Sequence, residues 1–191
     1  KNKPSYKIDI ENNPEYNICP NIKITPPRYS LDYTLLGSKG TKFNLIKEGV
    51  KRGKNNKVRE ILVTNKEQNK KKQYAFKESL DGDIFNEAIL EIENKKIECA
   101  GIIPMVPMTF GEKKGIIMPL ADGDLSTAIG KLNVNQVIDI TNIIGDILLC
   151  MLDKNIYYFD INPENILFKC DKNGEKASIH LGGMGSIISK G

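Results

Sequence analysis

The side chains best able to bind a metal or to attack a substrate, cysteine and histidine, are few and scattered. Cysteines occur only at Cys19, Cys99, Cys150 and Cys170, and His180 is the single histidine. There is no C-x-x-C pair and no histidine at metal-ligand spacing from a cysteine, so neither a structural zinc site nor a Cys–His nucleophile is expected. Buried free thiols are the simplest interpretation, and export of the protein would allow two disulfides instead.

A second group of reactive side chains is charged or carries an amide. The stretch "YFDINPENILF", residues 158–168, contains Asp160 and Asn165, and the stretch "YAFK" ends in Lys77. Residues 47–77 hold eleven Lys or Arg against three Glu, which gives this block a charge of +8 in a chain of net charge +4. A basic block of this kind can bind phosphate, nucleic acid or an acidic protein. The alternative interpretation is a hairpin whose charged side chains are simply solvated.

The elements that must position these residues are of mixed type. Runs rich in β-branched and aromatic residues predict strands over 43–50, 58–64, 73–78, 105–110 and 115–120, and "ASIHL" predicts a last strand. The stretch "DGDIFNEAILEIENK" predicts a helix that begins at Asp81 or Asp83. A longer buried helix is predicted over 135–154, with an apolar face made of Val137, Ile140, Ile144, Ile147, Leu148 and Met151.

The ends of the chain differ from this central part. Residues 1–30 carry five prolines among Asn and Lys, which predicts an extended arm rather than a packed element. The first residues lack the apolar run of a signal peptide, and no run of 18 apolar residues predicts a membrane span. No internal repeat divides the chain.

Strands, a helix, two strands and a long helix that leads into a D-x-x-x-x-N loop together resemble the protein kinase fold over roughly residues 43–186. The resemblance implies an α+β bilobal fold. Residues 31–121 would form the N-lobe and hinge, with a five-stranded antiparallel sheet and one helix, and residues 122–191 the first part of the C-lobe. Because the chain stops before an activation segment and the later helices, we expect it to be part of a longer protein.

Kinases use a Gly-rich loop, a lysine and a helix glutamate to hold ATP phosphates. In this chain, Gly53 alone survives of the three loop glycines, and Val58 stands where a valine covers adenine. A register that uses Gly37 and Gly40 fits the following hairpin less well. "YAFK" resembles the family's V-A-I-K, which implies that Lys77 contacts the phosphates. Its helix partner is then Glu87, with Glu91 one turn further on as the competing candidate.

Two further segments resemble the hinge and the catalytic loop. "GIIMPLADGDL" implies that Met118 is the gatekeeper and that main-chain groups of Pro119, Leu120 and Ala121 meet the purine. In "YFDINPENILF", Asp160 stands where the family keeps its catalytic aspartate, and Asn165 where it keeps a metal ligand. Tyr158 and Phe159 replace the family's His and Arg, and Asn162 stands where most kinases carry a lysine.

The segment "IHLGGMGSI" departs from the family most. It resembles the strand and D-F-G motif, with Gly183 in place of the metal-binding aspartate, so Mg²⁺ binding is not expected and ATP binding is expected to be weak. The resemblance therefore implies a pseudokinase, a scaffold or allosteric partner of an active kinase or of an acidic protein. An atypical active Ser/Thr kinase is the alternative, and a nucleotide- or polyanion-binding module is a third class.

Amino-acid composition gives only general indications of the binding partners and the cellular location of the protein. A nucleic-acid partner is not expected. The bias towards Lys, Asn and Ile suggests an AT-rich genome. Together with the resemblance to pseudokinases, this bias suggests the secreted pseudokinases of apicomplexan parasites as one possible group. The cytoplasm is slightly favoured over secretion.

Overall fold

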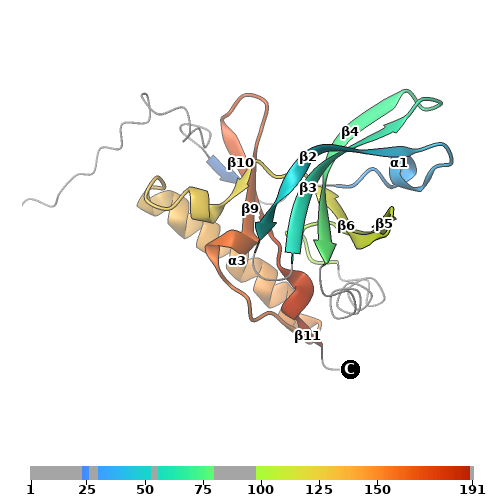
Figure 1. Cartoon of the computed structure of the whole chain (residues 1–191). Helices are drawn as coiled ribbons and strands as arrows, with labels where there is room; N and C mark the ends of the chain where they lie inside the picture. The colour runs from blue at the N-terminus through green and yellow to red at the C-terminus, as the bar shows by residue number, and fades with distance from the viewer. Residues whose placement is uncertain (1–22, 26–29, 53–55, 80–97, 190–191) are drawn as a thin grey trace, which may run out of the picture.

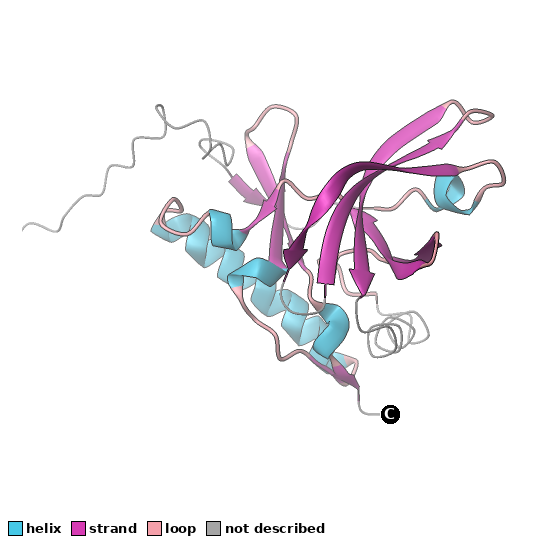
Figure 2. Cartoon of the chain, in the orientation of Figure 1, coloured by secondary structure: helices cyan, strands magenta, loops and turns pink. Residues whose placement is uncertain are grey.

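The computed structural model describes residues 23–25, 30–52, 56–79 and 98–189. The described residues form a mixed α+β structure with a five-stranded antiparallel sheet, a smaller sheet and one long helix (Figures 1 and 2). The predicted helix over residues 81–95, with Glu87 and Glu91, lies outside the described residues, as does Gly53.

The five-stranded sheet has the strand order β2-β3-β4-β6-β5. Its strands are β2 (Lys42–Arg52), β3 (Asn56–Asn65), β4 (Lys70–Ser79), β5 (Val106–Phe110) and β6 (Lys113–Pro119). All five predicted strands are confirmed, and their neighbours pair antiparallel. Alternating apolar residues predicted them well because successive side chains of a strand point to opposite faces of the sheet.

Each face of this sheet has its own core. Tyr74 and Phe76 of β4 face a cluster with Leu35 and Leu36 of the short helix α1 (Tyr33–Gly37). The backbone N–H of Leu35 donates to Asp32, 2.9 Å away, which caps this helix. On the other face, Ala75 packs with Ile103, Ile116 and Met118. Lys77 alternates with Phe76, so it belongs to the face of Ala75.

Close approach of β6 to β4 requires a glycine beside Lys77. A Cβ added at Gly115 would lie 2.2 Å from the carbonyl oxygen of Lys77, well inside contact distance. Any larger residue at this position would push the strands apart. Gly115 therefore helps to place Lys77 against the neighbouring strand.

The smaller sheet has the order β1-β10-β9-β7, and a separate two-stranded sheet joins β8 and β11. Their bounds are β1 (Lys23–Thr25), β7 (Gly123–Asp124), β8 (Ile156–Tyr157), β9 (Ile166–Cys170), β10 (Lys176–Leu181) and β11 (Ile188–Ser189). β1 runs parallel to β10, and its Ile24 is buried. Residues 23–25 of the predicted arm are therefore a packed strand, which sequence analysis did not predict.

The long helix α3 (Val134–Asp153) packs against the smaller sheet (Figure 1). Asn133 and Gln136 form a capping box at its start. Ile140, Ile144, Ile147 and Met151 are buried as predicted, whereas Val137 is 48% exposed, so its assignment to the buried face was wrong. The buried stripe of α3 begins at Ile140, since Val134, Val137 and Ile138 in its first turns are all exposed.

Among the described helices, only α3 is long and apolar enough to meet the length and composition of a membrane span. Core helices of soluble proteins reach the same length and composition. Its buried face belongs to the core of the smaller sheet, and a membrane span is not supported.

His180 lies in β10 and is only 1% exposed. Burial lowers the pKa of its imidazole from 6.5 to about 4. Between these two values the unfolded chain binds more protons than the folded chain, so the free energy of unfolding falls as pH drops from about 6.5 towards 4. We expect a loss of about 2 kcal/mol at pH 5, from about 1.4 kcal/mol per pKa unit.

Urea unfolding at pH 7 and pH 5 measures this effect. In His180→Gln, which cannot become charged, the difference between the two pH values is expected to shrink by that amount. Identical pH dependence in the wild type and the variant would contradict a neutral buried His180.

Candidate functional site

The candidate site begins at the loop between β8 and β9, which contains the short 3₁₀ helix Pro163–Asn165. The Asn162 side chain caps this helix by accepting from the N–H groups of Glu164 and Asn165 at 3.0 and 3.2 Å. Its amide nitrogen donates to Asp160 Oδ1, 3.0 Å away. Asn162 therefore connects Asp160 to the 3₁₀ helix through a neutral amide and brings no positive charge.

Asn165 closes the loop from the other side. Its Nδ2 donates to the carbonyl oxygen of Asp160 at 2.8 Å, and its own carbonyl oxygen accepts from the N–H of Gly182 at 2.7 Å. The loop is thus joined to the segment that follows β10. Sequence analysis placed Asp160, Asn165 and Gly183 at one site, and the structure brings them together.

Gly183 is the position where the sequence lacks an expected aspartate, and its surroundings leave little room for one. Its φ is +70°, in the left-handed region that favours glycine. A Cβ added there would lie 2.4 Å from Cγ of Asn165, 2.5 Å from Nδ2 and 2.6 Å from Oδ1. The Asn165 carboxamide therefore fills the space into which a side chain at Gly183 would begin.

Tyr158 joins this arrangement from the end of β8. Its hydroxyl donates to the carbonyl oxygen of Gly182 at 2.7 Å. Burial raises the pKa of the Tyr158 phenol, and the negative charge of Asp160 raises it further, against a weaker opposing effect from Asn165. The phenol stays protonated at neutral pH, and its hydrogen bond holds the Gly182 backbone.

Lys77 approaches the same site from β4 of the large sheet. In the strand register it lies opposite Val58 of β3 and Ile116 of β6. Burial lowers the pKa of Lys77, and the negative charge of Asp160 partly restores it. The charge of Asp160, in the loop after β8, therefore acts on Lys77 in β4 of the large sheet.

An apolar cluster lies beside these polar groups. Buried Ala75, Ile103, Ile116 and Met118 pack with the half-buried side chains of Val58, Met105, Leu120 and Leu167. Sequence analysis named Val58, Met118 and Leu120, and it missed Leu167, which comes from the smaller sheet. Its position two residues after Asn165, in an apolar strand, was the signal available in the sequence.

The linker after β6 runs between the two sheets and is fastened to β9. The Leu120 carbonyl oxygen accepts from Lys169 Nζ at 3.3 Å, and the N–H of Asp122 donates to the Phe168 oxygen at 2.9 Å. The Asp122 carboxylate accepts from the N–H of Cys170 at 2.7 Å. Ala121 lies half-buried within this segment. These bonds hold the predicted hinge in place against the smaller sheet.

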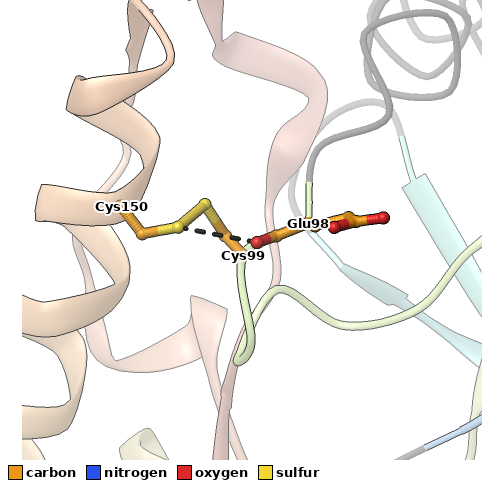
Figure 3. The surroundings of a disulfide bond; sticks show 3 residues. All are labelled: Glu98, Cys99 and Cys150. Atoms are coloured by element: carbon orange, nitrogen blue, oxygen red, sulfur yellow. Dashed lines mark hydrogen bonds between the residues drawn. A yellow bond between two sulfur atoms is a disulfide. The ribbon is translucent and has the colours of Figure 1, made fainter.

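A disulfide joins the segment that leads into Ile103 of the apolar cluster to the long helix α3. Cys99 and Cys150 are bonded, with 5.8 Å between their Cα atoms (Figure 3). The Cys150 sulfur lies 3.8 Å from the Glu98 carbonyl oxygen, and an oxidised sulfur has no proton to donate, so this approach is a van der Waals contact. Cys170 is disulfide-bonded as well. The free-thiol interpretation is therefore wrong for the described cysteines.

Metal ligands are sparse here. Within the described ranges, no group of three or more His, Cys, Asp or Glu is placed to hold a metal ion. At the predicted metal site Asn165 supplies one amide oxygen, and Gly183 supplies no side-chain atom. This donor set does not fit Mg²⁺, which prefers carboxylates and water in octahedral geometry.

No protein family model matches the chain, and no curated protein matches it. The likeness to protein kinases therefore stays a prediction, and the predicted roles of Gly53 and Glu87 remain predictions as well.

Proposed function

We propose that this chain is a protein-kinase-like domain that has lost phosphoryl transfer, a pseudokinase that works by binding. The observation that carries the proposal is the pairing of Gly183 with Asn165, where a side chain for a metal ion is missing and its space is filled. The order along the chain supports the kinase-like assignment: Lys77 in β4 of the large sheet, then Asp160 and Asn165 in the loop between β8 and β9, then Gly183 just after β10.

The residues present fit a purine nucleotide better than they fit its metal ion. The apolar side chains of Val58, Ala75, Met118 and Leu167 would enclose the base, and Lys77 would meet a phosphate. The linker from Pro119 to Ala121 would offer main-chain groups to the edge of the base. We expect weak ATP binding in which magnesium has little part.

The same residues account for the loss of catalysis. Asp160 is available as a proton acceptor, but Asn162 holds it with a neutral amide and brings no cation to the transferring group. Without an acidic ligand at Gly183, the charge between the phosphates is not neutralised. A loss of about 4 kcal/mol of transition-state stabilisation slows a reaction roughly a thousandfold.

A transfer assay with radiolabelled ATP and generic acceptor proteins tests this proposal. We expect incorporation by the wild type to equal that of Asp160→Asn and of a blank without enzyme. Incorporation above the blank that is lost in Asp160→Asn would show an atypical active Ser/Thr kinase instead.

We also propose that the protein works in an oxidising compartment, contrary to the slight preference for the cytoplasm drawn from composition. The Cys99–Cys150 disulfide supports this, because structural disulfides persist mainly in exported proteins and oxidising organelles.

The binding partner of this chain would be another protein, and an acidic protein suits the basic block over residues 47–77. The structure qualifies that block, since Lys70 and Lys72 both form ion pairs with Asp32, at 3.2 and 3.3 Å.

A further inference from the structure

The long helix α3 carries a second apolar face, separate from the one that meets the smaller sheet. Six residues follow one another there at intervals of three or four: Val134, Ile138, Thr141, Gly145, Leu149 and Leu152. This spacing places them along one side of a helix. We call them the outer stripe. Its four apolar side chains are 48–74% exposed and take no part in the core that α3 shares with the smaller sheet.

The middle of the outer stripe is open. A Cβ added at Gly145 would have nothing within 4 Å, so there is space for a bulky side chain above this residue. The Thr141 hydroxyl donates to the Val137 carbonyl oxygen at 2.7 Å, so its polar group is already satisfied. At 1.5 Å per residue, the stripe is about 27 Å long. An exposed apolar surface that continues over five turns of a helix is typical of an interaction site.

An acidic row lies beside the outer stripe. Asp139, Asp146 and Asp153 are exposed and recur every seven residues, so they share one side of α3. Each directly follows a residue of the stripe and therefore lies about 100° further round the helix. α3 contains no Lys or Arg, and among the described residues no basic side chain forms an ion pair with these aspartates. The row is therefore a negative charge that the described part of the chain does not offset.

The two features together favour one kind of occupant. A second copy of this chain would bring another α3 without a cation, and an antiparallel copy would place the two acidic rows side by side. Anionic lipid would be repelled by the same row. A strand gains nothing from α3, because the backbone groups of a helix already bond to one another. A helix with an apolar stripe and flanking Lys or Arg satisfies both features, since these long side chains reach beyond the apolar contact.

We propose that the outer stripe of α3 binds a basic amphipathic helix of a partner protein. The apolar side chains of that helix would pack along the stripe, with a large one above Gly145, and its Lys or Arg residues would meet the acidic row. This helix would bind independently of the nucleotide site. Its chemistry is opposite to that of the acidic partner proposed for residues 47–77.

Fluorescence polarisation with a labelled 21-residue peptide tests the proposal. The peptide has three heptads, with Leu at the first and fourth positions, Lys at the flanking positions and Ala elsewhere. We expect saturable binding at 50 mM NaCl, weakened severalfold at 300 mM because screening acts on exposed charges. A scrambled peptide of equal composition, whose Leu residues share no face, should bind at least tenfold more weakly, and so should the peptide with Glu in place of Lys.

Variants of the apolar residues locate the binding surface. Ile138→Gln/Leu149→Gln should weaken binding at least tenfold, and Gly145→Leu, which fills the open space, should weaken it severalfold. The matched control is Leu45→Gln/Ile46→Gln, which makes the same kind of change at exposed apolar residues of β2. This control should bind nearly as the wild type does. Circular dichroism spectra establish that the variants are folded.

Variants of the charged residues test the acidic row. Asp139→Asn/Asp146→Asn should weaken binding severalfold at 50 mM NaCl and remove most of its salt dependence. Glu112→Gln/Glu175→Gln removes the same charge at exposed residues outside α3 and should leave binding nearly unchanged.

Three results would overturn the proposal: no binding at low salt, equal binding of the scrambled peptide, or equal weakening in the α3 variants and their controls. Dimerisation that is lost in Ile138→Gln/Leu149→Gln, seen by sedimentation velocity, would assign the stripe to a second copy instead. Co-sedimentation with phosphatidylserine-containing vesicles that this variant abolishes would assign it to lipid. An ATP titration of the same samples is a separate test of the proposed function. ATP binding without peptide binding removes only the docking proposal, and peptide binding without ATP binding removes only the nucleotide site.

Discussion

Loss of the Cys99–Cys150 disulfide is expected to lower the free energy of unfolding by about 4 kcal/mol. The bond closes a loop between cysteines that are 51 residues apart in the sequence. In the chain-entropy account, a cross-link over a loop of this length restricts the unfolded chain by about that amount. It also ties the segment that leads into Ile103 of the apolar cluster to α3, so its loss should loosen the candidate site.

The measurement is urea unfolding of the double variant Cys99→Ala/Cys150→Ala against the wild type, both without reductant. Replacing both cysteines leaves no unpaired thiol from this pair to form other disulfides. Peptide mapping of the unreduced wild type should recover the two cysteine peptides as one linked species. Separate peptides, or equal stability of the two proteins, would contradict a structural disulfide and with it the oxidising compartment.

Gly183→Asp is expected to destabilise the protein by about 2–3 kcal/mol and to leave phosphoryl transfer at background. The new side chain would need a left-handed backbone, which costs about 1 kcal/mol or more, and its Cβ would overlap the Asn165 carboxamide. We therefore expect that an aspartate at this position does not create a metal site, because the Asn165 carboxamide already occupies the space.

Gly182→Ala is the matched control. A Cβ there would lie 3.5 Å from Leu167 Cδ1, which is ordinary contact, so little loss of stability is expected. In a double-mutant cycle, Asn165→Ala should relieve the steric part of the Gly183→Asp cost and give strong non-additivity. Additive effects, or measurable phosphoryl transfer by Gly183→Asp alone, would show that Asn165 does not block this position.

The large sheet was predictable because its strands alternate apolar and polar residues over five or more positions, as in "YAFK" with Tyr74 and Phe76 on one face. The helix α1 was missed because five residues cannot display a helical period. The strand β1 was missed because its partner β10 follows about 150 residues later in the chain. Val137 was assigned wrongly because an apolar pattern does not tell which of the apolar residues in the first turns of a helix are covered by neighbouring elements.

The candidate site was predictable as a set of residues but not as a geometry. Asp160, Asn165 and Gly183 could be placed by their spacing within one motif pattern. That Asn165 fills the space at Gly183 depends on a backbone angle and a contact between separate segments. Disulfide pairing could not be derived either, since four cysteines allow three connectivities.

Calorimetric titration of ATP into the folded protein, with and without magnesium, tests the central claim of a binding site without phosphoryl-transfer chemistry most directly. We predict weak, saturable binding whose Kd changes less than threefold when magnesium is added, because Gly183 offers the ion no ligand. Binding should be lost in Lys77→Ala, which removes the predicted phosphate contact. Binding that tightens tenfold or more with magnesium, or that is unchanged in Lys77→Ala, would contradict the proposed function.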